Sequence, residues 1–441
     1  MVYRAMIRSV LDYGCIAFDC ASAKQKEKLD VVQTKALAIC CGSMIGTACA
    51  ALQVDCGEMP LGIRRRQLMM EYVAKTETIP DHPTRCVARK ARLRGTQPGQ
   101  EMITVKVRRV HEKVARPPLE PVEHCSHPPW RLQAPVVDTG LQGQTGITAD
   151  HLVKYADRPQ LFTSGSRTPE GKASYAFYVP SADFQESGRL TDNTSVFAAE
   201  LMAIVRAINW CVSEKCPGPV ILTSCLSAVQ SVGERESKAR PRLLNRLLEG
   251  YDAHRLLCPA SPATLVWIPG HSGLSGREQA VLLSREAAGR SDVDQELSLE
   301  FGDVRLMYRD HFLREWQELW TKSITGSHYR EIEPYVGLEP KFTDRIRRKE
   351  RVITRLRFGH CRLNACLAKI KRHDTGKCDA CDVSETVTHY LMECPKQLAL
   401  QTQLLDECTR GGTRWTLRSI LSGSRHVEMI YTWLVEQNQM L

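Results

Sequence analysis

No run of about eighteen consecutive apolar residues, the minimum for a membrane-spanning helix, occurs in this sequence. The first residues, MVYRAMIRSVLDYG, also lack the long apolar core and the small-residue cleavage site of a secretory signal. These absences argue against a membrane protein and against a secreted one. We therefore expect a protein of the nucleus or the cytoplasm that has no transmembrane segment and no membrane partner.

Internal repeats are also absent, and the cysteines show no disulfide framework. The 18 cysteines are scattered along 441 residues. Without a secretory signal, this distribution favours free thiols and a metal site over disulfide bonds. The chain is too long for one compact core, so we expect several domains. Its 43% hydrophobic and 25% charged residues are typical of a globular protein.

A regular pattern of strands and helices extends over residues 161–289. It begins with a run of strand-forming residues that breaks at 164–166, and two further strands are expected over 174–180 and 183–190. Three consecutive strands with tight connections predict an antiparallel arrangement.

An amphipathic helix is expected next, behind the polar residues Asn193 and Thr194, because apolar residues recur at helical spacing at Leu201, Ile204, Val205 and Ile208. Strands and helices then alternate, with strands over 219–224 and 264–268 and helices over 225–232, 242–257 and 276–288. Strand–helix–strand order predicts parallel pairing. We expect an α/β domain over 155–290, with a mixed five-stranded sheet and helices packed on it.

Four segments of this region, FTSGS, AAEL, ILTSCLSAVQ and WIPGHSGLSGREQA, resemble the ordered signature blocks of a type 1 ribonuclease H domain. The form they are most similar to is carried by LINE-like non-LTR retrotransposon polyproteins. The resemblance implies a ribonuclease H-like fold and hydrolysis of the RNA strand of an RNA–DNA hybrid by two Mg²⁺ ions held on carboxylates. It implies catalytic roles for Glu200 and for the loop histidine His271.

The other three family carboxylate positions are occupied by Ser164, Ser224 and Val281. Mg²⁺ requires anionic oxygen ligands, which a hydroxyl or an isopropyl group cannot replace. No Ser/His/acid set surrounds the two serines, so a serine nucleophile is not expected. We expect a pseudoenzyme with a degraded Mg²⁺ site. An active hybrid ribonuclease remains open only if unexpected ligands such as Asp192 or Glu278 complete the site.

Residues 1–80 have a helical pattern. Ser22 and Gln25 fit a capping box, and an apolar stripe reaches Gly42 through Leu29, Val32, Ala36 and Ile39. A further helix is expected over 61–75. The segments YRAMIRSVLDYGCIAF, KLDVVQTKAL and ALQVDCGEMPLGIRRRQL resemble the thumb-like region that follows the polymerase palm in LINE-like reverse transcriptases.

No polymerase active site is expected. The sequence Tyr155-Ala156-Asp157-Arg158 is similar to the polymerase Tyr-x-Asp-Asp motif, but Arg158 replaces the second metal-binding Asp. Residues 81–154 are rich in basic residues and proline and are expected to form a linker.

Residues 291–375 are expected to form helices, followed by further helices over 397–441. An aromatic stripe within 303–321 is expected to pack in a core, through Tyr308, Phe312, Trp316 and Trp320. Residues 341–377 contain thirteen Lys and Arg against three acidic residues, a net charge of +10 that equals the charge of the whole chain. A helix that is basic on one side indicates contact with a nucleic-acid backbone, and the predicted binding residues are Arg347, Arg348, Arg351, Arg355 and Arg357.

A metal site is predicted within 376–396. Cys378, Cys381, His389 and Cys394 form a Cys-x₂-Cys-x₇-His-x₄-Cys set, which is zinc-ligand spacing. The segment resembles the C-terminal zinc knuckle of LINE-like polyproteins. The sequence thus predicts a retroelement-derived protein that binds nucleic acid, as an RNA–DNA hybrid or as single-stranded RNA or DNA. The alternatives are an active hybrid endoribonuclease and a zinc-stabilised protein-interaction module.

Overall fold

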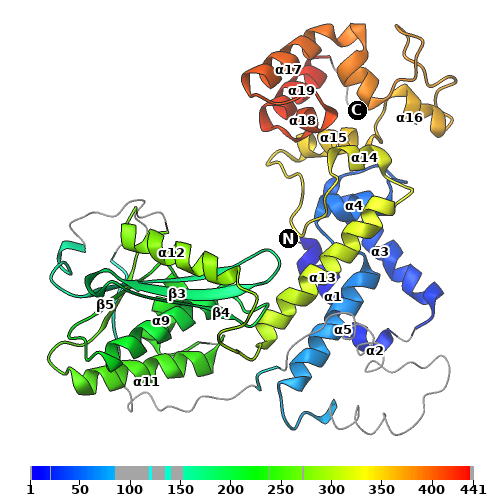
Figure 1. Cartoon of the computed structure of the whole chain (residues 1–441). Helices are drawn as coiled ribbons and strands as arrows, with labels where there is room; N and C mark the ends of the chain where they lie inside the picture. Colours follow the sequence, from blue (N-terminus) through cyan, green and yellow to red (C-terminus); the bar gives the residue numbers. More distant parts are fainter. Residues whose placement is uncertain are drawn as a thin grey trace. The chain divides into compact units, whose positions relative to one another are not determined.

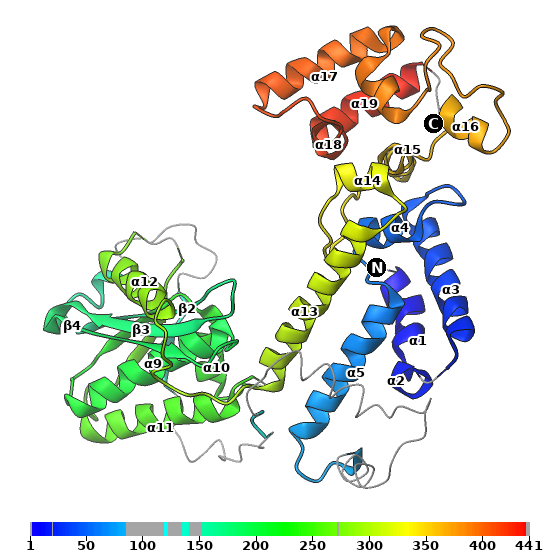
Figure 2. The same ribbon diagram turned by 45° about the vertical axis from the view of Figure 1, so that its right-hand side comes forward.

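The computed structural model describes residues 2–19, 21–84, 119–121, 135–140, 152–237, 239–270 and 273–437. The described residues form two compact units. The helical unit contains residues up to 70 together with those from 308 onwards, and the sheet unit contains the described residues from 71 to 307. Figures 1 and 2 show the ribbon of each unit.

The sheet unit is built on a six-stranded mixed sheet of order β1-β6-β5-β2-β3-β4. Its strands are β1 (Val136–Asp138), β2 (Gln160–Arg167), β3 (Ala173–Val179), β4 (Phe184–Leu190), β5 (Val220–Thr223) and β6 (Thr264–Trp267). The pairs β2–β3 and β3–β4 are antiparallel, whereas β5 pairs in parallel with β2 and β6. This confirms the expected antiparallel group followed by parallel strands.

Two expectations about the sheet were wrong. The sheet has six strands and not five, because β1, from the segment expected to be linker, pairs in parallel with β6. The first strand also does not break at 164–166, since β2 continues in register with β3 through Ser164, Gly165 and Ser166. Gly165 is needed there for close packing: a Cβ at this position would lie 2.4 Å from the backbone nitrogen of Glu200.

Helices cover both faces of this sheet (Figure 1). On one face α9 (Val196–Ser213), α10 (Leu226–Glu234) and α11 (Pro241–Leu257) share a core with alternate strand residues such as Leu161 and Ile221. On the other face α12 (Ser275–Ala288) packs against Phe162 and Leu222. The alternation along each strand follows from the pleat. A short 3₁₀ helix, η2 (Pro180–Ala182), joins β3 to β4.

Among the described residues, α9 is the one helix long and apolar enough to cross a membrane. Eleven of its residues are buried. Its position between the sheet and α11 accounts for its apolar composition.

The described residues in the first part of the helical unit form a π-helix and five α-helices. They are η1 (Tyr3–Arg8), α1 (Ser9–Asp12), α2 (Cys15–Phe18), α3 (Ala23–Cys41), α4 (Cys49–Cys56) and α5 (Leu61–Glu77), the last of which continues past residue 70. The predicted capping box is confirmed at the start of α3. The Ser22 side chain accepts a hydrogen bond from the backbone N–H of Gln25, and the Gln25 side chain accepts one from the backbone N–H of Ser22. Gly42 ends α3 in the left-handed conformation, with φ of 69°.

The predicted apolar stripe of α3 was wrong in part. Val32 and Ile39 are exposed, and the buried face of α3 instead contains Gln33, Ala36, Leu37 and Cys41. Gln33 is buried because its amide donates hydrogen bonds to the carbonyl of Met59 at 3.0 Å and to the Tyr3 hydroxyl at 3.3 Å. A satisfied polar side chain thus occupies the core face of the helix.

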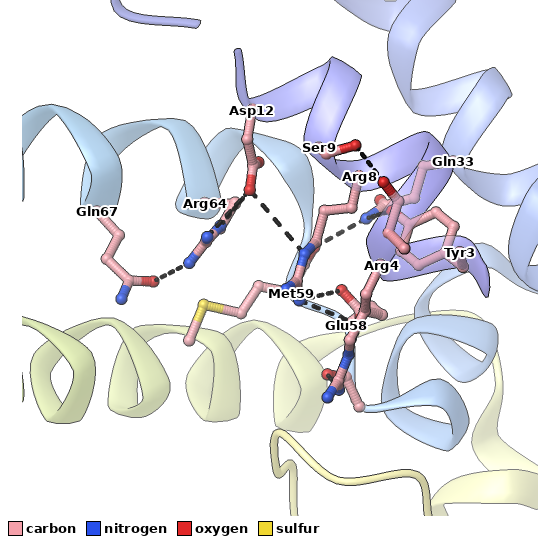
Figure 3. Close-up of polar contacts among 12 residues, drawn as sticks. Tyr3, Arg4, Arg8, Ser9, Asp12, Gln33, Glu58, Met59, Arg64 and Gln67 are labelled. Atoms are coloured by element: carbon pink, nitrogen blue, oxygen red, sulfur yellow. Dashed lines mark hydrogen bonds and ion pairs between the residues drawn. The ribbon is translucent and has the colours of Figure 1, made fainter. Parts of the chain in front are cut away.

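Ion pairs connect these N-terminal helices (Figure 3). Arg4 and Arg8 both donate to the buried carboxylate of Glu58, at 2.5 and 3.2 Å. Arg64 donates to Asp12 at 3.0 Å. The charge of Glu58 is therefore compensated by two guanidinium groups from η1.

The second part of the helical unit is also helical. Its elements are α13 (Phe301–Lys322, in this unit from residue 308), α14 (Ser327–Ile332), α15 (Arg347–Phe358), α16 (Asn364–Lys369), η3 (His389–Glu393), η4 (Pro395–Gln397), α17 (Leu398–Arg410), α18 (Leu417–Ser422) and α19 (Ser424–Glu436). The prediction for α13 is confirmed, since Tyr308, Phe312, Trp316 and Trp320 are all buried. A common core joins α15, η3 and the last three helices.

Candidate functional site

The four predicted metal ligands come together in the helical unit, in the segment between α16 and α17. Hydrogen bonds to the Cys378 carbonyl from the backbone N–H groups of Cys381 and Asp382 close a tight turn, and Cys378 N–H donates to Val383 at 2.8 Å. Asp382 takes a left-handed conformation, with φ of 54°. This turn brings the thiols of Cys378 and Cys381 to the same side.

The geometry of the cluster matches a tetrahedral zinc site. The Sγ atom of Cys394 lies 3.8 Å from those of both Cys378 and Cys381, which are 4.0 Å apart. With Zn–S bonds of about 2.3 Å, tetrahedral geometry places two sulfur ligands roughly 3.8 Å apart. The ligand atoms of all four residues lie within 4.8 Å of one another.

The imidazole of His389 is oriented as a metal ligand. It lies in the π-helix η3, and its Nε2 atom is buried with no hydrogen-bond partner. Its other nitrogen, Nδ1, lies 3.6 Å from the Glu393 carboxylate. A carboxylate on one ring nitrogen orients a histidine whose other nitrogen binds metal. An ion at the centre of the cluster would give the unpartnered Nε2 a partner.

This donor set fits zinc in a structural role. Three thiolates and one imidazole fill a tetrahedral coordination shell and leave no open position for a substrate. The cluster is continuous with the core of the helical unit, because Val387, Tyr390 and Leu391 are buried there. Glu385 also accepts a hydrogen bond from the backbone N–H of Asn364 at 2.7 Å. A bound ion would hold this segment against α16 and α17.

The second predicted site contains Glu200. Its carboxyl group is buried and makes no ion pair within the described residues. It is 6% exposed, and Thr223 Oγ1 donates to it at 3.4 Å. Burial raises the pKa of Glu200 to about 7, although hydrogen bonds from the Gly165 backbone and Thr223, and the charge of Arg277, act in the opposite direction. At neutral pH a substantial fraction of this carboxyl group is protonated.

The positions predicted to have lost carboxylates now make neutral contacts. Ser164 on β2 is buried, with its hydroxyl 3.1 Å from that of Ser284 on α12. The Ser224 carbonyl, after β5, accepts a hydrogen bond from the Trp267 indole at 3.2 Å. Val281 lies half-buried on α12. His271, the predicted loop histidine, lies outside the described residues.

The alternative ligands do not complete a Mg²⁺ site in the described part of the chain. No group of three potential metal ligands there includes Glu200. Asp192 is instead paired with Arg189, and Glu278 is not grouped with Glu200 either. One glutamate cannot provide the charge that two divalent cations need.

Sequence inspection missed a second group of three potential ligands, Cys41, Asp55 and Cys56. The Asp55 carboxylate is already engaged, because the Tyr329 hydroxyl donates to it at 2.8 Å and Arg357 lies 3.7 Å away. Burial raises the pKa of Asp55 to about 6 against the lowering effect of Arg357. We interpret this group as a buried polar network that joins α4 to α14 and α15.

The predicted nucleic-acid-binding arginines divide into two groups. Arg347, Arg348 and Arg351 are exposed on α15 and Arg355 is half-buried. The prediction is wrong for Arg357, which is 0% exposed. Its guanidinium pairs with Glu333 at 3.0 Å and donates to the Leu421 carbonyl at 2.9 Å, so it cannot reach a phosphate.

Arg347 and Arg355 also bind the C-terminal end of α3. Arg347 donates to the carbonyls of Ile39, at 2.5 Å, and Cys40. Arg355 Nε donates to the carbonyl of Gly42 at 3.2 Å. These carbonyls carry the negative end of the helix dipole, which favours cations. Arg347 and Arg355 therefore have a structural role in holding α15 against α3.

Comparison of the sequence with models of known protein families, and with curated proteins, finds no match. The site residues are therefore assigned from contacts within the chain. On those contacts, the Cys378–Cys394 cluster can hold a zinc ion.

Proposed function

We propose that this chain is a retroelement-derived, zinc-stabilised nucleic-acid-binding protein whose ribonuclease H-like domain does not cleave. The observation that carries the binding function is the row of arginines on α15, of which Arg348 and Arg351 extend to the surface. They belong to a segment of net charge +10, followed directly by the Cys/His cluster. Concentrated positive charge of this kind attracts a phosphate backbone.

Two features support the ribonuclease H-like assignment. The sheet has the expected antiparallel group followed by parallel strands, and the four family positions fall on β2, α9, the end of β5 and α12. The neutral contact of Ser164 with Ser284, and the burial of Glu200 outside any group of three potential ligands among the described residues, support the loss of cleavage. The substrate class that the resemblance implies, an RNA–DNA hybrid, remains the first nucleic acid to test.

Binding is tested with the full-length, zinc-loaded protein and labelled hybrid, single-stranded RNA and single-stranded DNA. With about four phosphate contacts, log K should fall against log salt with a slope of roughly −3. The double change Arg348→Ala and Arg351→Ala should flatten the slope by about 1.5 units. Arg418→Ala, an exposed change on α18, is the control. A slope near zero in the unmodified protein would favour the protein-interaction alternative.

Cleavage is tested on the same hybrid with Mg²⁺ or Mn²⁺ present. We expect no product from the unmodified protein. Metal-dependent cleavage that disappears in Glu200→Gln would favour the active endoribonuclease, and it would require ligands that the described residues do not bring together.

A further inference from the structure

A pocket of about 920 Å³ lies within the helical unit, between the end of α3, the loop over 42–48 and α15. Its volume falls in the range of ligand pockets, about 300–1,000 Å³. Apolar residues of α3 and the loop line one side, and arginines of α15 line the other. No acidic residue lines it. We call it the α3/α15 pocket.

The apolar side of the α3/α15 pocket is open to solvent. Ile39 is 76% exposed and Ile45 is fully exposed, and Met44 lies between them in the lining. One exposed aliphatic side chain needs no explanation. Here the apolar side chains gather in a cavity next to cations, so an occupant of the pocket would remove them from water.

On the basic side Arg347 is paired with Glu350, whereas part of the remaining positive charge is not neutralised by the described residues. Arg351 and Arg355 make no ion pair within the described residues, and Lys35 adds a further cation to the lining. Burial, together with the charges of Arg351 and Arg362, lowers the pKa of Arg355. An anion in the pocket would relieve this repulsion.

The α3/α15 pocket is held in shape by contacts on both sides. Thr47 and His360 lie within hydrogen-bonding distance, at 3.0 Å, and this contact ties the loop to the end of α15. The aliphatic stem of Arg351 lies over Gly42, where an added Cβ would come within 2.8 Å of its Cγ. A preformed pocket loses less conformational entropy on binding.

We propose that the α3/α15 pocket binds single-stranded nucleic acid, with a base against Ile39 and Ile45 and the adjoining phosphates on Arg348 and Arg351. The inference rests on the proposed function and assigns it a site. Arginine side chains suit this role because their planar groups bind phosphates through paired donors and also stack on bases.

Nucleic acid is favoured over an acidic peptide for two reasons. First, Arg348 and Arg351 are three positions apart on α15, so both side chains lie on the same side of the helix and can contact neighbouring phosphates of one strand. Second, the pocket lies within a basic segment whose net charge is +10 over residues 341–377, a charge suited to a polyanion.

The test compares a short oligothymidylate with the same oligonucleotide in which every base is replaced by an abasic residue. The full-length protein should bind the base-bearing strand about tenfold more tightly. Ile45→Ser should abolish that preference without changing the affinity for the abasic strand. Arg351→Ala should weaken binding of both strands and reduce the salt slope by about 0.7.

Matched controls are Ile324→Ser, which removes an isoleucine that is 98% exposed elsewhere in the unit, and Arg418→Ala. Neither should change the preference. Salt-dependent binding with equal affinity for both strands, unaffected by Ile45→Ser, would overturn the assignment of the α3/α15 pocket as the binding site. It would leave the proposed function standing. Binding of an acidic peptide that Arg351→Ala abolishes, with no binding of either oligonucleotide, would overturn both.

Discussion

The Cys/His cluster and the Glu200 region are both predicted from resemblance as metal sites, and they differ in the donor groups that the structure brings together. The cluster has all four donors, with sulfur atoms 3.8 to 4.0 Å apart and an imidazole nitrogen with no other partner. The Glu200 region has one carboxyl group, whose hydrogen-bond donor is the Thr223 hydroxyl, and Ser164 there contacts Ser284.

We attribute the difference to what a metal ion would contribute to the fold at each place. A small Cys/His segment has little apolar core of its own, so the free energy of zinc binding is also its folding free energy. The Glu200 region lies on a sheet with two covered faces, and residues such as Leu201, Ile204 and Val266 are buried regardless of any ion. Catalytic ligands can thus be lost there while the fold persists.

The largest expected effect is removal of the zinc ion. Chelation, or Cys394→Ser, should cost on the order of 10 kcal/mol of local stability. Hydrogen exchange should then accelerate over residues 376–396 while β2, β3 and α9 stay protected. Cys40→Ser, a change at an exposed cysteine, is the control. Undiminished protection in a protein shown to be free of metal would mean that the cluster is not a structural site.

A smaller effect is expected from Arg357, which lies beside two carboxylates in the helical unit. Arg357→Ala leaves Asp55 and Glu333 without their buried partner, and should lower the free energy of unfolding by about 3 to 5 kcal/mol. Arg348→Ala, on the exposed side of α15, should change it by less than about 0.5 kcal/mol. Denaturant titration of the two variants checks this, and equal losses would show that the two arginines have been wrongly distinguished.

Glu200 has no such partner, so its replacement should stabilise the protein. Its pKa is about 7 in the folded state and 4.5 ordinarily. As pH rises from 4.5 to 7 the unfolded state ionises first, and the free energy of unfolding falls. Glu200→Gln should therefore raise that free energy by about 3 kcal/mol at pH 8 and have no effect near pH 4.

The pH profile of Glu200→Gln is compared with that of the unmodified chain. The pKa values of Asp55 and Glu300 are also raised by burial, both to about 6, so only the difference between the two profiles isolates Glu200. A contrary result would be a variant that is less stable than the unmodified protein at pH 8 when Mg²⁺ is present. Stabilisation of the unmodified protein by Mg²⁺, without stabilisation of the variant, would show that Glu200 still binds a cation.

The smallest effect concerns Mg²⁺ itself. The unmodified protein should show no change in stability on Mg²⁺ addition. The combined changes Ser164→Asp, Ser224→Asp and Val281→Asp should restore a site, giving about 1 kcal/mol of stabilisation at Mg²⁺ several times Kd and some hybrid cleavage. Any two of the three changes should give much less. A folded triple variant that binds no Mg²⁺ would show that the scaffold has moved.

The sequence predicted features set by near neighbours. The capping box at Ser22 and the Cys/His spacing both depend on residues close in the chain, and both are found in the structure. It did not predict β1, because three residues carry little strand signal and their partner, β6, is far along the chain. The sequence also did not show that Arg357 is buried whereas Arg351 is exposed. That distinction depends on Asp55 and Glu333, which pair with Arg357 and lie elsewhere in the chain.

The hydrogen bonds from α15 to the end of α3 have a consequence for synthesis of the chain. Arg347 reaches the carbonyl of Cys40 across 307 positions, and both residues belong to the helical unit. That unit is therefore discontinuous, and the sheet unit is an insertion between its two parts. At roughly 5 to 20 residues per second, the ribosome needs about 10 to 50 s to make the insertion. Through that interval the end of α3 lacks its arginine contacts and is capped by Gly42 alone. A chaperone would be of most use in this period.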